Sequence, residues 1–177
     1  SKGSAYLNPS FVESVIVLKD GTRIEGTPMR YNLYTQQMQF IEEGDTMALG
    51  NPEQIDYLRI AEKVFVYTSF IENKEHKSGY FELLEDGECR LLKRWTALYH
   101  VIDENENSNA YGFYRDCYCY LQFFMNPATP AQKKRKGLAL SFASNGDEVF
   151  DYMKDEKLKP KNDTDLVKVV EYYNNLQ

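Results

Sequence analysis

Residues 11–26 read "FVESVIVLKDGTRIEG", in which a short apolar run, an Asp-Gly pair and a second short run follow one another. An Asp-Gly pair between two such runs is a strong β-hairpin signal, because glycine accepts the positive φ of a tight turn. The sequence therefore predicts two antiparallel strands joined at Asp20 and Gly21.

Further short runs continue outward from this hairpin. Up to residue 70 they read "MRYNLYT", "QMQFIE", "QIDYLRI" and "KVFVYTSF", and turn-forming residues separate them: Gly26, Pro28, Gly44 and the pair Asn51 and Pro52. We expect about six strands in residues 11–70. A second hairpin, built on Asp86 and Gly87, is predicted in residues 78–126, where residues 114–124 form one more strand.

The pattern changes to helix beyond Pro127 and Pro130. A cluster of potential capping residues precedes the apolar face of a predicted helix that Pro160 ends: Ser144, Asn145 and Asp147. A last helix is predicted from Asp163, because its apolar positions follow helical spacing: Leu166, Val169, Val170 and Tyr173. Residues 137–142, "GLALSF", fit either a short helix or a strand.

Strands first and helices last predict an α+β fold that is mainly β, because no helical crossover separates the strands. We expect antiparallel sheets, as a sandwich or a partly closed barrel, followed by C-terminal helices. The predicted domains are a β region at 1–126, with units at 11–70 and 78–126, and a helical region at 127–177 packed on it.

Composition excludes several classes of protein. The net charge of -6 argues against a nucleic-acid partner, since phosphate binding needs concentrated Lys and Arg. No apolar run approaches the ~18 residues of a membrane span, so the chain is predicted not to be membrane-spanning. The basic run "KKRK" at 133–136 is interpreted as a solvated linker or helix start, with anionic polymers or lipid headgroups as the alternative.

Residues 114–124 read "YRDCYCYLQFF" and hold two of the three cysteines. In a strand, Cys117 and Cys119 share a face with apolar residues, and their parallel side chains are too far apart to bridge each other. We interpret both thiols as small buried groups. A disulfide from Cys89 to either one, or a metal site, are the alternatives.

The opposite face of the same strand carries Tyr118 and Tyr120. A tyrosine ring is apolar at its body and polar at its tip. The pair is therefore expected to form either a second packed layer or a flat platform for a sugar ring or peptide.

No catalytic, cofactor-binding or metal-binding residue is predicted, because the common motifs for these functions are absent. His76 and His100 are isolated and are interpreted as structural. Carboxylates on the predicted strand faces are interpreted as solvated, although two of them could form a glycosidase pair: Glu13, Glu25, Asp56 and Glu82.

Three segments together resemble a family of exported bacterial proteins whose function is unknown: "YLNPSFVESVIVLKDGTRIEGTPMRYN", "YFELLEDGECRLLKRW" and "EKLKPKNDTDLVKVVEYYNN". The resemblance implies export, a removed signal peptide and a periplasmic or cell-surface location. It implies no site residue and no cofactor.

The leading hypothesis is an exported, non-enzymatic binding or envelope-associated protein whose partner is a glycan or another envelope component. One alternative is a hydrolase with an unrecognised carboxylate or His site, for which paired carboxylates in a cleft would be evidence. Another is a structural module that docks on a partner through an exposed apolar patch.

Overall fold

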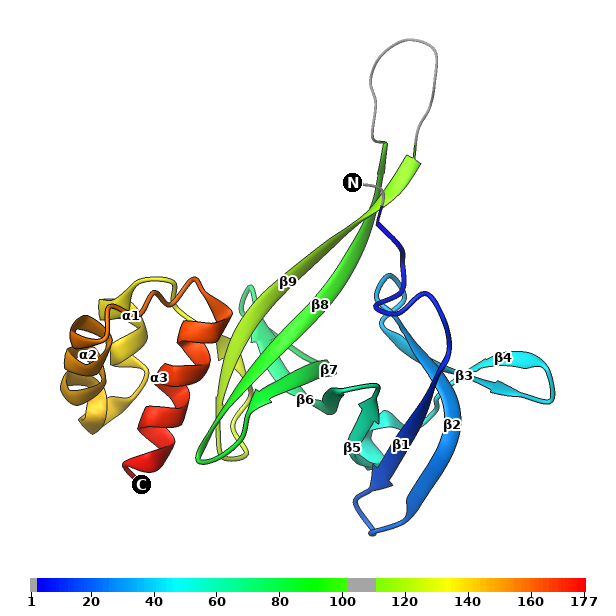
Figure 1. Cartoon of the computed structure of the whole chain (residues 1–177), viewed down its shortest axis with the longest axis horizontal. Coiled ribbons are helices and arrows are strands. Elements are labelled where there is room, and N and C mark those ends of the chain that lie inside the picture. Colours follow the sequence, from blue (N-terminus) through cyan, green and yellow to red (C-terminus); the bar gives the residue numbers. More distant parts are fainter. Residues whose placement is uncertain (1–2, 102–110) are drawn as a thin grey trace. The chain divides into compact units, whose positions relative to one another are not determined.

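The computed structural model describes residues 3–101 and 111–177, and its elements follow the predicted order of strands and then helices (Figure 1). The strands are β1 (Val12–Leu18), β2 (Arg23–Asn32), β3 (Gln37–Glu42), β4 (Asp45–Ala48), β5 (Ile55–Ile60), β6 (Lys63–Glu72), β7 (Glu75–Glu85), β8 (Cys89–Val101), β9 (Tyr111–Phe123) and β10 (Thr129–Pro130). The helices are α1 (Arg135–Leu140), α2 (Gly146–Asp155) and α3 (Asp163–Asn175), with short 3₁₀ turns at Pro52–Gln54 and Ala143–Asn145.

All ten strands belong to one antiparallel sheet, in the order β10-β9-β8-β7-β6-β5-β1-β2-β3-β4. Most neighbours in the sheet are also neighbours in the chain, as expected of strands joined by hairpins. The predicted α+β, mainly β class with C-terminal helices is confirmed. In residues 3–101 and 111–177 the strands form one sheet rather than two packed sheets, which was one of the two predicted arrangements.

The hairpin at Asp20 and Gly21 forms as predicted between β1 and β2. The Gly21 amide donates to the Leu18 carbonyl at 2.9 Å, and the Asp20 carboxylate accepts from the Thr22 amide at 2.8 Å. Gly21 has φ +89°, a conformation that a Cβ disfavours. The second predicted turn, at Asp86 and Gly87, connects β7 to β8.

Gly26 and Pro28 were predicted to separate two strands, and this prediction is wrong, because β2 runs through both residues. The register of β1 against β2 shifts from Ser14↔Thr27 to Val15↔Glu25. Gly26 is therefore the extra residue of a β-bulge and has φ +73°. The bulge absorbs the glycine without ending the strand.

Strand β4 was not predicted. All four of its residues are exposed, so it has no apolar pattern to read. The turn before it uses Glu43 at φ 50° and Gly44 at φ +86°, the two positive φ angles of a tight hairpin turn.

The chain folds into two compact units. One comprises Ser1–Thr68, Gly79–Glu82 and Arg94–Tyr118, and the other comprises Ser69–Ser78, Leu83–Lys93 and Cys119–Gln177. Strands β6 to β9 contribute residues to both units, whereas the predicted boundary at 126 and 127 follows the change from strand to helix. No helix in the described part of the chain is long and apolar enough to cross a bilayer.

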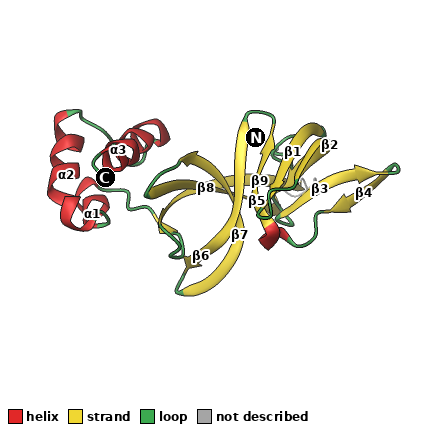
Figure 2. Ribbon diagram, turned by 90° about the horizontal axis from the view of Figure 1, so that it is seen from below, coloured by secondary structure: helices red, strands yellow, loops and turns green. Residues whose placement is uncertain are grey.

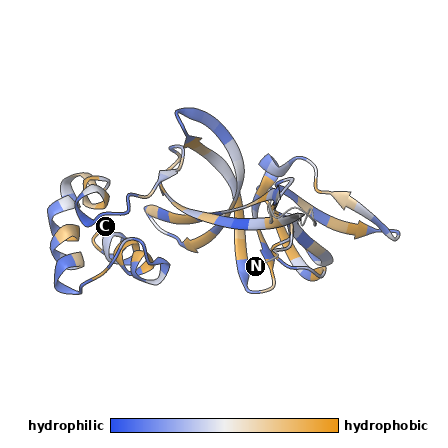
Figure 3. Ribbon diagram, turned by 90° about the horizontal axis from the view of Figure 1, so that it is seen from above, coloured by the Kyte–Doolittle hydropathy of each residue, from blue (hydrophilic) through white to orange (hydrophobic). Residues whose placement is uncertain are grey.

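The core of the first unit centres on Tyr31, whose ring packs edge-on against Phe65 at 5.6 Å and Tyr80 at 5.7 Å. Hydrophilic and hydrophobic residues are interspersed along the strands (Figure 3), as strands with one buried face require. The buried cluster consists of Ile16, Met29, Tyr31, Leu33, Met38, Ile55, Leu58, Ile60, Phe65, Tyr80 and Ala97.

The second unit packs the three helices, which lie together in Figure 2, on parts of β8 and β9. Helix α3 begins at Asp163 as predicted, and the Asn162 side chain caps it by accepting from the Asp165 amide at 3.1 Å. Its apolar positions Leu166, Val169, Val170 and Tyr173 are buried.

The start of α2 and the residues of α1 differ from or complete the sequence-based predictions. The predicted capping cluster of α2 makes no side-chain capping hydrogen bond, because a 3₁₀ turn at Ala143–Asn145 leads directly into the helix. Of the ambiguous residues 137–142, residues 137–140 belong to α1, where Leu138 and Ala139 are buried.

A polar contact joins α3 to β8. Asn174 Oδ1 accepts from the Cys89 amide at 2.8 Å, and Asn174 Nδ2 donates to the Cys89 carbonyl at 2.9 Å. A Cβ on Gly87 would lie 2.5 Å from the Asn174 side chain, so this turn needs glycine for close approach.

Candidate functional site

The two tyrosines singled out in the sequence have different environments. Tyr118 is 45% exposed, whereas Tyr120 is 3% exposed and packs edge-on against Phe70 at 5.7 Å. Tyr120 thus belongs to a packed layer, the first of the two predicted roles. Of this pair, Tyr118 alone presents its ring to solvent.

The three cysteines are free, so neither bridging alternative from Cys89 forms. The prediction that both closely spaced thiols are buried is wrong for Cys117, which is exposed, and Cys119 is half-buried. Strand alternation fixes which face a side chain occupies, but burial depends on what covers that face. The helical core covers Cys119 and Leu121, and Cys117 lies outside that cluster.

Cys119 is held by a polar contact. Its Sγ donates to Asp163 Oδ1 at 3.4 Å, and Lys93 Nζ donates to Asp163 Oδ2 at 2.7 Å. Partial burial opposes ionisation of Asp163, but the hydrogen bond and charge of Lys93 outweigh it and lower the pKa of that carboxyl. Asp163 is therefore an ion-pair partner that anchors the start of α3.

The carboxylates of the hydrolase hypothesis either have hydrogen-bond partners or are exposed. Glu82 is buried, and its two oxygens accept from Trp95 Nε1 at 2.9 Å and Lys63 Nζ at 3.4 Å. Glu25 pairs with Arg23, while Glu13 and Asp56 are exposed.

The two histidines lie at the surface. His76 and His100 are both exposed. Within residues 3–101 and 111–177, no group of three His, Cys, Asp or Glu side chains could hold a metal ion.

The structure instead brings together an exposed aromatic surface, which we call the β8–β9 face. Residues two apart along a strand share a face. The His100 and Tyr114 rings, 5.8 Å apart, connect the two strands. The face consists of Leu98, His100, Tyr114, Asp116 and Tyr118.

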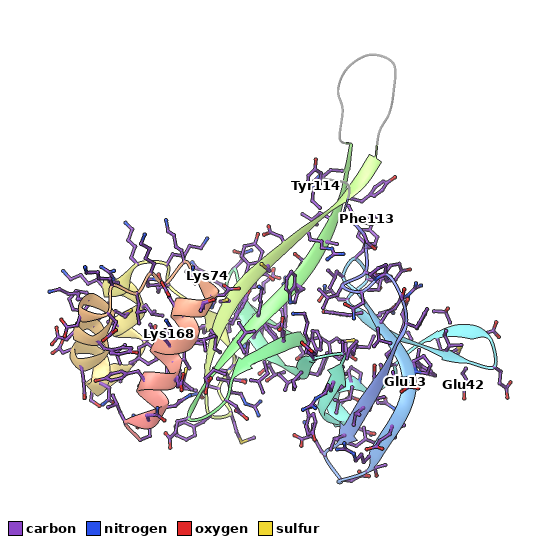
Figure 4. All side chains as sticks on the ribbon, viewed as in Figure 1. Glu13, Glu42, Lys74, Phe113, Tyr114 and Lys168 are labelled. Carbon is purple, nitrogen blue, oxygen red and sulfur yellow. The ribbon has the colours of Figure 1, made fainter. Side chains whose placement is uncertain are left out.

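Every side chain of the β8–β9 face is exposed. The large apolar ones retain 55% (Leu98), 43% (Tyr114) and 45% (Tyr118) of their accessible surface. Figure 4 places Tyr114 toward the end of the β8–β9 pair. Scattered single exposed rings are ordinary, but a contiguous set on one strand face is a recognised mark of a binding surface.

A carboxylate is fixed within this face. Asp116 Oδ2 accepts from the Tyr118 hydroxyl at 2.5 Å, and Asp116 Oδ1 accepts from the Cys117 amide at 3.0 Å. The carboxylate therefore has a defined orientation between two rings and keeps lone pairs for further donors. The face combines flat apolar surface with an oriented hydrogen-bond acceptor.

The other side of β9 has a second aromatic group. Phe113 packs against Tyr99 at 5.0 Å and Tyr34 at 5.5 Å. The N-terminal segment lies nearby, since the Gly3 amide donates to the Phe113 carbonyl at 2.9 Å and Arg115 Nη2 donates to the Tyr6 carbonyl at 2.8 Å. On this side of β9, Phe113 and Arg115 are therefore in contact with other residues of the protein.

Sequence reasoning found Tyr118 but missed Tyr114 and Asp116. The signal was present, because all three stand two apart in "YRDCY" and so share one strand face. The contribution of His100 and Leu98 required knowledge of the β8–β9 pairing.

Comparison with family models, curated proteins and solved structures finds no match to this chain. The resemblance to exported bacterial proteins stays a prediction. The β-rich region and C-terminal helices fit that description only in outline.

Proposed function

We propose that this protein is a non-catalytic binding protein that holds a neutral glycan on the β8–β9 face. The observation that carries the proposal is the set of exposed rings around the oriented carboxylate of Asp116. Tyr114 and Tyr118 supply flat surfaces for the apolar face of a sugar ring, and Asp116 supplies an acceptor for its hydroxyl groups.

Charge supports a neutral ligand. The whole chain has a net charge of -6, and the β8–β9 face has a carboxylate at its centre. An acidic glycan or a nucleic-acid phosphate would approach against this charge, whereas sugar hydroxyls would not.

We also propose that the protein is exported and works at the periplasmic side or the cell surface as an envelope-associated protein. The family resemblance supports this location. Fractionation of the source cells tests it: we expect the protein in the periplasmic or surface fraction, and recovery with cytoplasmic enzymes would contradict it.

A glycan screen that includes peptidoglycan fragments tests the binding function. We expect the wild-type protein to bind at least one neutral glycan, and the variant Tyr114→Ser/Tyr118→Ser to lose that binding. Tyr34→Ser is the matched control, since Tyr34 is 55% exposed but belongs to the other aromatic group. Equal binding by the double variant would contradict the proposal.

A further inference from the structure

A second feature, independent of the β8–β9 face, lies in the helical unit. Two adjoining hollows of about 430 Å³ and 480 Å³ share Lys133 and Lys134 in their lining. We call them together the basic hollow. Its cationic residues are Lys133, Lys134, Arg135, Lys136, Lys159 and Lys161.

Hydrogen bonds between side chains and backbone groups hold the two basic segments, residues 133–136 and 159–161, in place. Arg135 Nε donates to the Leu158 carbonyl at 2.7 Å, which joins the start of α1 to the connection between α2 and α3. Leu158 is buried in the helical core, so this contact has a rigid support. The Lys159 amide donates to Asp165 Oδ2 at 2.9 Å, which fixes the second basic segment.

Acidic residues do not neutralise the hollow. In the part of the chain that the structure describes, none of its five lysines forms a salt bridge with a carboxylate. Two acidic residues that follow the second basic segment have other partners than the lysine ammonium groups: Asp163 pairs with Lys93, and Asp165 accepts from the Lys159 backbone amide.

This concentration of positive charge departs from the rest of a chain whose net charge is -6. Like charges held together repel one another, and a bound anion relieves that repulsion. Pro160 lies between Lys159 and Lys161, so these two lysine stems start from a stiffened backbone. The ammonium groups are compact charges with three donors each, which suits phosphate oxygens.

We propose that the basic hollow binds a ligand with several phosphate groups. Several phosphates, rather than one, match six cations spread over two adjoining hollows of ligand size. The same chemistry occurs in a soluble oligophosphate and in the headgroups of an anionic lipid surface.

The test uses the whole protein and two probes. Tripolyphosphate, titrated by calorimetry at 150 mM salt, represents the soluble source. Vesicles of phosphatidylcholine with or without phosphatidylglycerol, measured by co-sedimentation, represent the lipid source. We expect the wild-type protein to bind at least one probe, with an affinity that falls as salt is raised.

Two variants that remove the same number of charges distinguish the effect of the basic hollow from the effect of net charge. Lys134→Gln/Lys159→Gln/Lys161→Gln removes three charges from the hollow. The control Lys74→Gln/Lys154→Gln/Lys168→Gln removes three exposed lysines of the same unit that do not line it, of which Figure 4 labels Lys74 and Lys168. All six changed lysines are exposed. Both variants should therefore melt within about 2 °C of the wild-type protein.

We expect the hollow variant to bind the successful probe at least about tenfold more weakly, and the control to change about twofold or less. Binding of tripolyphosphate identifies a soluble ligand, and binding of anionic vesicles alone identifies a lipid headgroup. Amide chemical shifts should move at residues 133–136 and at Lys159 and Lys161. Failure of both probes, equal weakening by both variants, or shifts confined to other residues would overturn the proposal.

Discussion

At the level of single residues, side chains of the same type differ in reactivity because they differ in burial. Cys89 is buried, and burial raises the pKa of its thiol to about 12, while Cys117 is exposed. The thiolate is the reactive form of cysteine. Burial and the raised pKa therefore both disfavour reaction at Cys89, whereas the Cys117 thiol is accessible.

Thiol alkylation of the native protein at pH 8 tests this difference. We expect iodoacetamide to modify Cys117 first and to leave Cys89 unmodified until the protein unfolds. Peptide mass spectrometry gives the order. Labelling of Cys89 as fast as Cys117, with the fold intact, would show that the cover over Cys89 is not as described.

Asn174 is a second residue with a large predicted effect. Asn174→Ala leaves the amide and carbonyl of Cys89 without their side-chain partner in a part-buried place. We expect a loss of about 1–3 kcal/mol in the free energy of unfolding, measured by urea denaturation. Its exposed neighbour provides the control: Asn175→Ala should change stability by less than about 0.5 kcal/mol. Equal effects from the two variants would be evidence against the Asn174 contact.

At the scale of elements, the sequence predicted those parts of the fold that local chemistry determines. Both Asp-Gly turns and helix α3 form where turn residues and helical spacing indicate them. The sequence did not predict β4, because a fully exposed strand has no alternation. The sequence-based prediction divided β2 at Gly26, because glycine is typical both of a β-bulge and of the end of a strand.

The same limit applies to the candidate site. Alternation along β9 is local and can be read from the sequence, as it was for Tyr118. The burial of Tyr120 against Phe70 and the exposure of Cys117 depend on partners distant in the chain. No local pattern contains that information.

Gly26 provides an element-scale prediction. Gly26→Ala places a Cβ at φ +73° in the bulge of β2, and we expect it to cost about 1–2 kcal/mol in urea denaturation. Gly50→Ala is the control, since Gly50 has open space around it and no positive φ. If Gly26→Ala is no worse than Gly50→Ala, the bulge does not require the left-handed conformation.

At the scale of the whole molecule, burial of ionisable groups predicts how stability depends on pH. Burial raises the pKa of Cys89 to about 12 and also raises the pKa values of Tyr31 and Tyr80. In the unfolded chain these groups lose their protons at their ordinary pKa values, about 8.5 for Cys and 10 for Tyr, while the folded protein retains them. Their contribution to stability is therefore complete below about pH 8.5 and is lost as the pH rises through the folded pKa values.

We therefore expect the free energy of unfolding to fall steadily from about pH 9 upward. Urea denaturation at a series of pH values measures the slope. Cys89→Ala should flatten the slope between about pH 9 and 10, where the unfolded thiol ionises before the tyrosines. A stability that is constant from pH 8 to 11 would contradict the burial of these groups.

The proposed function of the whole molecule rests on the β8–β9 face, and calorimetric titration of the best neutral glycan from the screen tests it most directly. With Tyr114→Ser/Tyr118→Ser we predict a dissociation constant raised about fivefold or more, since two stacked rings at about 0.5–1.5 kcal/mol each contribute about 1–3 kcal/mol together. Tyr34→Ser should leave the constant within about twofold of the wild-type value. An unchanged constant in the double variant, with the fold intact, would contradict glycan binding at this face.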